Sequence, residues 1–186
     1  MTKRPDDGDS TAAFADVLGA FATGVTLVTV ADGRDDIGTT VSAFCPVSAD
    51  PPLVLVSLIA GSYPAEVLGR ADLFAVTLLA SGQRVLAGRF AVAGRPGARL
   101  LLDGVPHHRG ELSGALIADG GLAALECEAS QRMPAGDHLL VIGRVLGLPY
   151  VAESGDPLIR YRGRYPEVAK DLGCGTQRGG ARPPRQ

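Results

Sequence analysis

Few residues of this chain have a type and spacing that could do chemistry. His107 and His108 are adjacent in a glycine-rich stretch, and Glu126 and Glu128 stand two residues apart. Neighbouring residues of an extended chain face opposite ways, so we interpret the two histidines as part of a solvated loop. The two glutamates share one face of a predicted strand, and paired carboxylates can act as acid and base. A polar outer strand face explains them without any chemistry, and we adopt that interpretation.

The cysteines and the standard catalytic motifs point to no reactive centre either. Cys45, Cys127 and Cys174 are scattered, and their spacing fits neither a disulfide framework nor a zinc site. We therefore expect reduced thiols, no bound metal and a cytoplasmic location. The sequence contains no nucleophile elbow of a serine hydrolase, no zinc-protease helix, no phosphate-binding P-loop and no dinucleotide-binding glycine motif after a strand. The cysteines and the standard catalytic motifs therefore do not identify a function.

Two further features have suitable chemistry for holding a polar ligand. The segment 38–42, Gly-Thr-Thr-Val-Ser, consists of small and hydroxyl-bearing residues, which fill a core poorly. A ligand can approach the backbone of such a strand closely and find hydroxyl donors beside it. His138 follows a Gly-Asp turn at the start of another predicted strand, where its side chain can reach the mouth of a barrel. We expect Asp137 to orient that turn.

The composition is that of one ordinary globular domain. The 186 residues are 46% hydrophobic and 20% charged, which is enough for a sizeable core. The formal net charge of -2 provides no basic footprint for nucleic acid and no strong field for a membrane surface. Residues 1–10 are polar and acidic, unlike a secretory signal, and the longest apolar run, 51–60, is far shorter than the ~20 residues of a membrane span. We therefore expect no nucleic-acid partner and no membrane partner.

Hydrophobic periodicity and turn residues predict about seven strands and three short helices. The expected strands cover residues 25–30, 37–44, 53–59, 73–79, 121–129, 137–148 and 158–165. The expected helices run from a cap at Ser10 or Thr11 to Gly24, over residues 64–69, and from a cap at Ser81 to about Phe90. Strands and helices do not alternate regularly. We therefore predict a mainly β fold, an antiparallel barrel with peripheral helices.

Some segments carry more specific expectations. The first helix has one amphipathic apolar stripe, formed by Phe14, Val17, Leu18 and Phe21. The strand 53–59 is apolar apart from Ser57, so it should be buried on both faces. Residues 91–119 contain many glycines and little periodicity, and we expect them to form long loops.

The domain organisation expected from the sequence is simple. Residues 1–10 form a disordered lead, and residues 11–165 form the single barrel domain. Residues 166–186 are rich in glycine and proline and poor in apolar side chains, so we expect a disordered or loosely docked tail.

Four segments, in this order along the chain, resemble signature segments of the short-chain flavin reductase family. They are residues 21–29 (FATGVTLVT), 38–56 with GTTVSAF and DPPLVLV, 135–145 with AGDH and GRV, and 161–165 (YRGRY). Members of this family are FMN-binding split barrels and act as reductase components of two-component flavin monooxygenases. The resemblance covers about residues 14–165 and implies a split β-barrel of the FMN-binding type.

The resemblance also implies where the flavin binds. The implied cofactor-binding residues are Thr39, Thr40, Val41, Ser42, Ser57, Gly61, Ser62, Arg89 and Phe90, and the implied catalytic residue is His138. Residues 39–42 would line the flavin ring and the ribityl chain. Ser42, the turn at 61–62 and Arg89 would contact the phosphate. The histidine at position 138 would lie beside the flavin and the nicotinamide.

Plainer interpretations of these residues stay open at this stage. Ser62 could simply cap a helix, and Ser57 could bond to backbone instead of facing the pocket. Arg89 could be a solvated side chain beside a core Phe90. His138 could be an ordinary turn histidine.

Two regions depart from the family pattern. The loop 59–64 lacks the basic residue that many relatives have there, which leaves Arg89 more of the charge facing a phosphate. Residues 94–119 fit the family poorly. This region contains Arg95, Arg99, His107, His108 and Arg109. It could form the nicotinamide side of the site or a surface for a partner.

The leading hypothesis is an NAD(P)H:flavin oxidoreductase. NADH or NADPH would donate a hydride to FMN, or to FAD, and the reduced flavin would pass to a separate oxygenase component. This chemistry needs neither a covalent nucleophile nor a metal. The family places the flavin at a subunit interface, so a homodimer is expected. The alternatives are a flavin-binding carrier or sensor without reductase turnover, and a barrel that binds other proteins without any cofactor.

Overall fold

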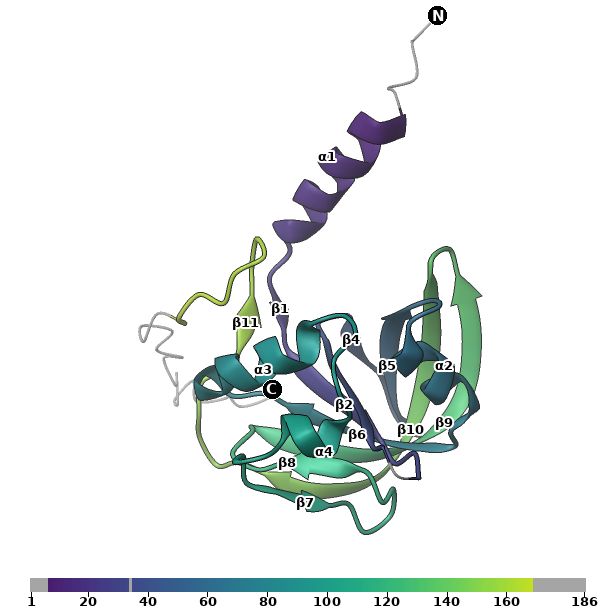
Figure 1. Cartoon of the computed structure of the whole chain (residues 1–186), viewed down its shortest axis with the longest axis vertical. Helices are drawn as coiled ribbons and strands as arrows, with labels where there is room; N and C mark the ends of the chain where they lie inside the picture. Colours follow the sequence, from purple (N-terminus) through teal and green to yellow (C-terminus); the bar gives the residue numbers. More distant parts are fainter. Residues whose placement is uncertain (1–6, 34, 169–186) are drawn as a thin grey trace, which may run out of the picture.

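A computed structural model describes residues 7–33 and 35–168 (Figure 1). The helices are α1 (Asp7–Gly19), α2 (Tyr63–Arg70), the one-turn 3-10 helix η1 (Ser81–Gln83), α3 (Arg84–Ala91) and α4 (Ala98–Leu101). The strands are β1 (Thr23–Gly24), β2 (Thr26–Val30), β3 (Ile37–Val41), β4 (Phe44–Ala49), β5 (Pro52–Ile59), β6 (Leu73–Leu78), β7 (His107–Arg109), β8 (Leu116–Ala118), β9 (Ala123–Ala135), β10 (His138–Val151) and β11 (Ile159–Arg160). The fold is therefore mainly β, as predicted.

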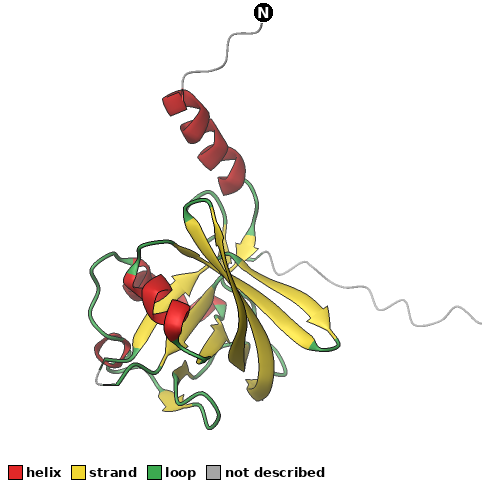
Figure 2. Ribbon diagram, turned by 90° about the vertical axis from the view of Figure 1, so that its right-hand side faces the viewer, coloured by secondary structure: helices red, strands yellow, loops and turns green. Residues whose placement is uncertain are grey.

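The principal sheet has seven antiparallel strands in the order β3-β2-β6-β9-β10-β5-β4. Its two edge strands, β3 and β4, are consecutive in the sequence and are joined only by Ser42 and Ala43. A two-residue link can join the opposite edges of one sheet only if the sheet curls until those edges meet. No ladder of hydrogen bonds pairs β3 with β4 in the described chain, so the barrel stays split (Figure 2). The predicted split barrel is confirmed.

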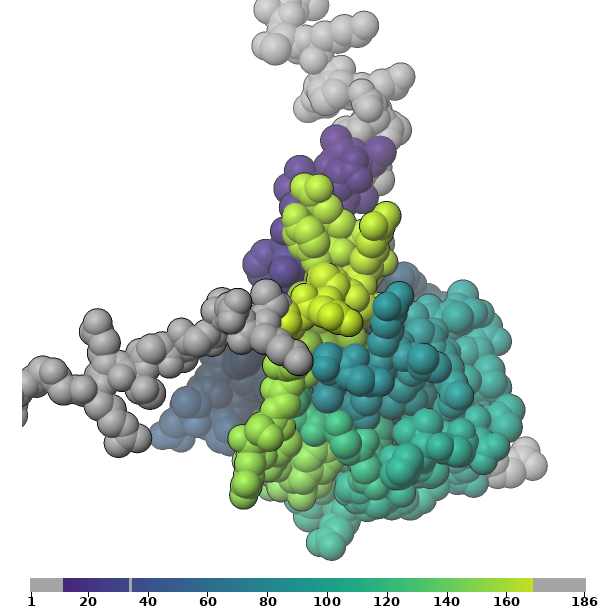
Figure 3. All heavy atoms as spheres, turned by 90° about the vertical axis from the view of Figure 1, so that its left-hand side faces the viewer, coloured from purple at the N-terminus to yellow at the C-terminus, as the bar shows by residue number. Residues whose placement is uncertain are grey.

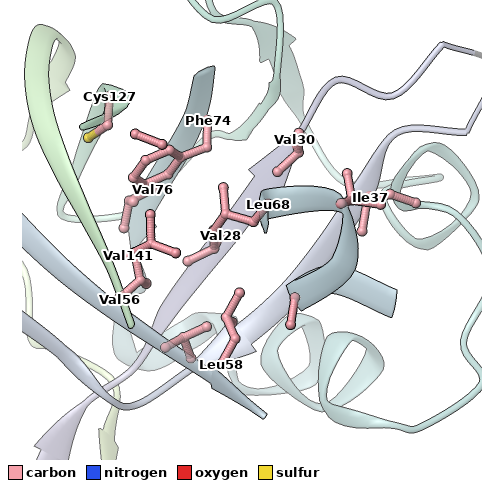
Figure 4. Close-up of a cluster of buried hydrophobic side chains, with 14 of the residues drawn as sticks. Val28, Val30, Ile37, Val56, Leu58, Leu68, Phe74, Val76, Cys127 and Val141 are labelled. Atoms are coloured by element: carbon pink, nitrogen blue, oxygen red, sulfur yellow. The ribbon is translucent and has the colours of Figure 1, made fainter. Parts of the chain in front are cut away.

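The interior of the barrel is filled by aliphatic side chains from alternating strand positions (Figure 4). Val56 of β5, Val76 of β6 and Val141 of β10 are fully buried there, together with Phe74. A second cluster lies under α3, where Phe90 packs with Leu27 and Leu79. The two clusters lie on opposite faces of the sheet because successive side chains of β2 alternate between them.

The prediction that 53–59 is buried on both faces is wrong. Val54, Val56 and Leu58 are buried, whereas Leu53, Leu55 and Ser57 are partly exposed. β5 lies in an antiparallel sheet, whose strands bury one face only. The partly exposed face of β5 is available to line a cavity.

The expected single strand 37–44 is two strands. β3 ends at Val41 and β4 begins at Phe44, and the chain changes direction at Ser42. Ser81 is likewise not a helix cap, since it is the first residue of η1 and Gln83 Oε1 accepts from the amide of Ala80 at 3.1 Å instead. The predicted strand 158–165 shortens to β11, which pairs with β1, and a turn follows it.

Residues 91–119 are more ordered than expected. They contain α4, β7 and β8, and the three residues of β8 are fully or almost fully buried against β6 and β2. Each of these elements is three or four residues long. A segment of that length is too short for periodicity to reveal.

The expected polar outer face at Glu126 is covered. The loop before β8 folds over Glu126, whose Oε1 accepts from the amide of Leu112 at 3.0 Å and from the amide and hydroxyl of Ser113, each at 2.7 Å. Glu128 instead forms an ion pair with Arg144 at 2.6 Å. The two carboxylates therefore serve separate structural contacts, and no acid–base pair exists.

The first helix stands apart from the barrel. α1 begins at Asp7, earlier than predicted, ends at Gly19 and projects away from the sheet (Figures 1 and 2). Three residues of its predicted apolar stripe are largely exposed, at 62% for Phe14, 69% for Val17 and 55% for Leu18, and Phe21, which follows the end of the helix, is 73% exposed. The rest of the expected lead, residues 1–6, and most of the expected tail, residues 169–186 with Cys174, lie outside the described residues. None of the helices in the described chain is long and apolar enough to cross a membrane.

Candidate active site

A cavity of about 850 Å³ opens where the barrel is split. Its lining comprises residues 37–43, 57–59, 62–64, 91 and 93–97, together with Val25, Asp35, His138, Arg160, Gly163 and Tyr165. We call residues 37–43 the strand wall and residues 91 and 93–97 the loop wall. The C-terminal lining residues reach the cavity because β11 pairs with β1. Figure 3 shows this C-terminal segment in yellow beside the N-terminal segment in purple. The volume is within the range typical of small-molecule sites.

The strand wall offers backbone and hydroxyl groups to a ligand. β3 pairs with β2 on one side only, so alternate N–H and C=O groups of β3 point away from the sheet. All four predicted residues of this wall line the cavity: Thr39, Thr40, Val41 and Ser42. The hydroxyl of Thr40, however, donates to the carbonyl of Ala87 in α3 at 2.7 Å. The side-chain donors left for a ligand on this wall are those of Thr39 and Ser42.

The opposite side of the opening is formed by the end of β5 and the start of α2. Ser57 lies on the partly exposed face of β5 and lines the cavity, as does Ser62. Ser62 is also the cap of α2, because its Oγ accepts from the amide of Ala65 at 3.3 Å and donates to the carbonyl of Ile59 at 2.7 Å. Gly61 precedes it with φ of 75° and is not part of the lining.

The structure does not bring Arg89 and Phe90 to the cavity. Phe90 is fully buried in the cluster under α3, directly beneath Gly38. Consecutive helical residues lie about 100° apart around the axis. Arg89 therefore points sideways, where its Nη1 donates to the carbonyl of Leu101 at 3.2 Å. The expected contact of Arg89 with a phosphate has no support in this geometry, and Phe90 is a core residue.

His138 stands at the rim of the cavity. It is the first residue of β10, opposite Ile59 of β5, and its side chain is 38% exposed. Its Nδ1 lies 2.7 Å from Oδ1 of Asp137. The hydrogen bond and the charge of His138 lower the pKa of Asp137. A carboxylate acceptor on Nδ1 leaves Nε2 as the ring atom available to a ligand.

Sequence reasoning named Arg95 only within the region 94–119, which could form the nicotinamide side of the site or a surface for a partner, and gave it no specific contact. Arg95 is half-buried there, with Nε donating to the carbonyl of Gly38 at 2.8 Å and Nη1 donating to the carbonyl of Val92 at 2.9 Å. Tyr63, at the start of α2, also lines the cavity, and its hydroxyl lies 3.3 Å from Asp32 Oδ2. A lone arginine in a glycine-rich stretch gave no pattern to recognise. Its contact with β3 is visible only in the tertiary structure.

The lining suits a flat, anionic ligand. Aliphatic side chains such as Ile37, Val41 and Leu58 lie beside backbone and hydroxyl donors. The charged side chains of the lining are Arg95, Arg160 and the carboxylate Asp35. Cations therefore outnumber carboxylates, which favours a phosphate-bearing ligand such as a flavin nucleotide. In the described part of the chain no three histidine, cysteine or acidic side chains come together as they would around a metal.

Comparisons with known proteins agree with this geometry. Residues 18–169 match the family model described as a flavin reductase like domain. The chain is 38% identical over 155 residues to an NADH-dependent FMN reductase of Streptomyces nodosus subsp. asukaensis, covering 82% of each. It is 35% identical over 153 residues to the reductase component of 4-hydroxyphenylacetate 3-monooxygenase of Thermus thermophilus, covering 82% of this chain and 93% of that one.

A solved structure gives the same match in three dimensions. The NADH:FAD oxidoreductase of Streptomyces globisporus, in complex with NAD and FAD fragments, superimposes with a TM-score of 0.82 at 31% identity. The match covers 91% of this chain and 99% of that chain. The split barrel and its connections are therefore shared along nearly the whole described chain.

Proposed function

Because this chain belongs to the flavin reductase like domain family, we propose that it is an NAD(P)H-dependent flavin reductase. It uses NADH or NADPH to reduce FMN or FAD by hydride transfer. The observation that carries this proposal is the cavity of about 850 Å³ at the split of the barrel, bounded by the hydroxyl-bearing edge strand β3 and by His138. The flavin and the nicotinamide supply the redox chemistry when they are bound.

The protein's own residues bind and orient the reactants. The unpaired backbone groups on the outer edge of β3, apart from the Gly38 carbonyl that accepts from Arg95, hold polar edges of the ligand together with the hydroxyls of Thr39 and Ser42. The aliphatic lining excludes water from the rings, which strengthens every polar contact made there. Ser57 and Ser62 face the ligand from the opposite side.

His138 is the proposed catalytic residue. Its Nε2 is free to face the cavity because Nδ1 is engaged by Asp137. In the protonated ring Nε2 donates a hydrogen bond toward negative charge that develops on the ligand. In the neutral ring it orients the nicotinamide amide. Hydride transfer takes no proton from the protein, so His138 acts by position and charge.

The proposed fate of the reduced flavin is transfer to a separate oxygenase component. Support comes from the Thermus relative, which is itself the reductase component of 4-hydroxyphenylacetate 3-monooxygenase. A reductase that hands on its product binds reduced flavin more weakly than it would a permanent cofactor. Dilution of the loaded protein is therefore expected to release flavin.

The proposed assembly is a homodimer. Among the described residues, the apolar stripe of α1 is largely exposed, and the helix projects away from the barrel (Figure 1). Such a face is normally covered by another chain. Light scattering at micromolar concentration should give a dimer, and the double change Leu18→Glu with Phe21→Glu should shift it toward monomer. Asp16→Asn on the same helix should leave the dimer intact. A monomeric wild type would contradict this part of the proposal.

The proposed location is the cytoplasm, which the free thiols of Cys45 and Cys127 support. The proposed domain ends near Tyr165, whose ring lines the cavity. Truncation after Tyr165 should leave a soluble protein with unchanged flavin affinity. Insoluble protein would show that the chain beyond that point docks on the domain.

The test of the proposed function is a steady-state assay with both nicotinamides and both flavins. Oxidation of NADH or NADPH that saturates with FMN or FAD is expected, with one pair preferred. A protein that binds flavin yet oxidises neither nicotinamide would be a carrier or sensor. A protein that binds no flavin would be a β-barrel that binds other proteins without a cofactor, and the proposal would fail.

A further inference from the structure

Arg95 is a cation that lines the cavity, and no described carboxylate pairs with it. Two of its nitrogens, Nε and Nη1, donate to the backbone carbonyls of Gly38 and Val92. Neither carbonyl carries a charge. In the described chain no carboxylate lies within ion-pair distance of Arg95, although Asp35 lines the same cavity. Its Nη2 has no hydrogen-bond partner among the described residues.

Other arginines that make polar contacts differ from Arg95 in their surroundings. Arg99 and Arg109 both pair with Asp36, at 2.6 Å and 2.7 Å. Arg144 pairs with Glu128 on an exposed strand face. Arg160 also lines the cavity without an ion pair among the described residues, but it is exposed. Arg95 is half-buried and is held in place by two backbone carbonyls.

Such an arrangement is costly unless an anion completes it. Burial lowers the pKa of Arg95 because the surroundings stabilise its charge less well than water does. An arginine nevertheless stays protonated near neutral pH. The two carbonyl contacts fix the plane of the guanidinium at one end of the strand wall. The N–H groups of a guanidinium fixed in this way match the arrangement of the oxygens of a phosphate.

We propose that Arg95 is the residue that receives a phosphate group of the nucleotide bound in this cavity, in the role that the family resemblance suggested for Arg89. The inference rests on the proposed function, because it takes a nucleotide to be the ligand. It assigns a specific role to the loop wall. Arg89 is less suited to that role, because it lies outside the cavity lining and its Nη1 donates to the carbonyl of Leu101.

Two kinds of nucleotide, a flavin and a nicotinamide, can bring a phosphate to this cavity, and one of each kind is compared with a phosphate-free counterpart. FMN is matched by riboflavin, and NADH is matched by dihydronicotinamide riboside. The experiment therefore measures the dissociation constants of FMN and riboflavin, and the KM values of NADH and dihydronicotinamide riboside. Each is measured for the wild type, Arg95→Gln and Arg95→Lys.

The expected result is a loss of affinity that is confined to the phosphate-bearing ligand. Arg95→Gln should weaken one phosphate-bearing ligand by about 10- to 100-fold, the size typical of a lost hydrogen bond to a charged group. Its phosphate-free counterpart should change less than about twofold. Arg95→Lys keeps the charge but not the fork, so it should retain part of the affinity. Which pair responds identifies whether the flavin or the nicotinamide provides the phosphate.

Two matched variants and one variant-free measurement complete the design. Arg84→Gln, at the exposed start of α3, should leave all four constants unchanged. Arg89→Gln tests the competing assignment directly. In the wild type, raising salt should weaken the phosphate-bearing ligand much more than its counterpart, because a charge contact is screened. That measurement does not depend on how any variant folds.

Three results would overturn the inference. Equal losses for a ligand and its phosphate-free counterpart would mean that Arg95 only shapes the wall. A phosphate-specific loss in Arg89→Gln with none in Arg95→Gln would restore the original assignment. Identical salt dependence for FMN and riboflavin, and for NADH and dihydronicotinamide riboside, would show that the protein makes no charged contact with a phosphate. A wild type that binds no flavin would instead refute the proposed function, and that result is separate from these three.

Discussion

The two walls of the cavity are built in different ways. The strand wall continues the barrel, since β3 is paired with β2 residue by residue from Ile37 to Val41. The loop wall is held by a few polar contacts, from Arg95 to Gly38 and from the amide of Ala98 to the carbonyl of Asp36 at 2.5 Å. The strand wall is therefore fixed by the whole sheet and contributes shape. The loop wall is fixed locally and contributes charge.

Blocking the strand wall should have the largest effect. Ser42 lines the cavity at the point where β3 ends. In Ser42→Leu a bulky side chain would occupy ligand space and a hydroxyl donor would be lost. Flavin affinity should fall by more than about a hundredfold, since a lost hydrogen bond to a charged group alone amounts to roughly 1.5–3 kcal/mol.

The matched control for Ser42→Leu is Val47→Leu, on the exposed part of β4 away from the cavity. It should leave flavin affinity unchanged. Fluorescence titration of FMN measures both variants. Unaltered affinity in Ser42→Leu would mean that the ligand does not lie against the strand wall.

Removing the rim histidine should affect rate rather than binding. In His138→Ala the flavin dissociation constant should stay within a fewfold of wild type. Reduction by NADH should slow by about a hundredfold, or the KM for NADH should rise, because a positioned electrostatic contact is lost. Asp137→Asn keeps the ring and should change the rate much less. If wild type and His138→Ala had equal reduction rates and equal nicotinamide affinity, His138 would be an ordinary turn residue without a catalytic role.

The packing behind the strand wall gives a stability prediction. A methyl group at Gly38 would overlap Cε1 of Phe90 and lie 2.9 Å from its Cδ1. Gly38→Ala should therefore lower the free energy of unfolding by about 2 kcal/mol, as overpacking of a buried ring does. Gly88→Ala on the facing helix has open space around it and should stabilise slightly. Urea unfolding distinguishes the two, and equal stabilities would contradict the close approach of α3 to β3.

The smallest of these effects concerns the support of the loop wall. Burial alone raises the pKa of Asp36, but the hydrogen bonds and charges of Arg109 and Arg99 outweigh it, so the pKa lies below its usual value. The stabilisation is present above about pH 4 and is lost as the pH falls through that lowered pKa. At pH 7, Asp36→Asn should lower the free energy of unfolding by about 1.5 kcal/mol.

The pH dependence provides the check on Asp36. The stability difference between wild type and Asp36→Asn should shrink as the pH falls below about 4. Glu128→Gln breaks an exposed pair with Arg144 and should cost no more than about 0.5 kcal/mol at any pH. A difference for Asp36→Asn that stays constant down to pH 3 would show that its charge contributes nothing.

Residues 39–42 of the strand wall were predicted one by one, whereas Arg95 of the loop wall was named only within the region 94–119, and the difference has physical reasons. β2, β5, β6 and β10 are runs of β-branched and aliphatic residues, and each lies within a few residues of its predicted range. The break at Ser42 was missed because no glycine or proline marks it. Arg89 does not line the cavity, because it adjoins the buried Phe90 and consecutive helical side chains point in directions about 100° apart. The contact of Arg95 with Gly38, far away in the sequence, could not be inferred from the sequence.

Anaerobic mixing of the FMN-loaded protein with NADH tests the central claim, that this cavity brings flavin and nicotinamide together for hydride transfer. The visible absorbance of oxidised flavin should disappear in a single turnover, at a rate that saturates with NADH and falls in His138→Ala. NADPH in place of NADH shows which nicotinamide is preferred. Flavin that is bound, as shown by titration, yet remains oxidised with both nicotinamides would contradict the account and leave a flavin-binding barrel without reductase activity.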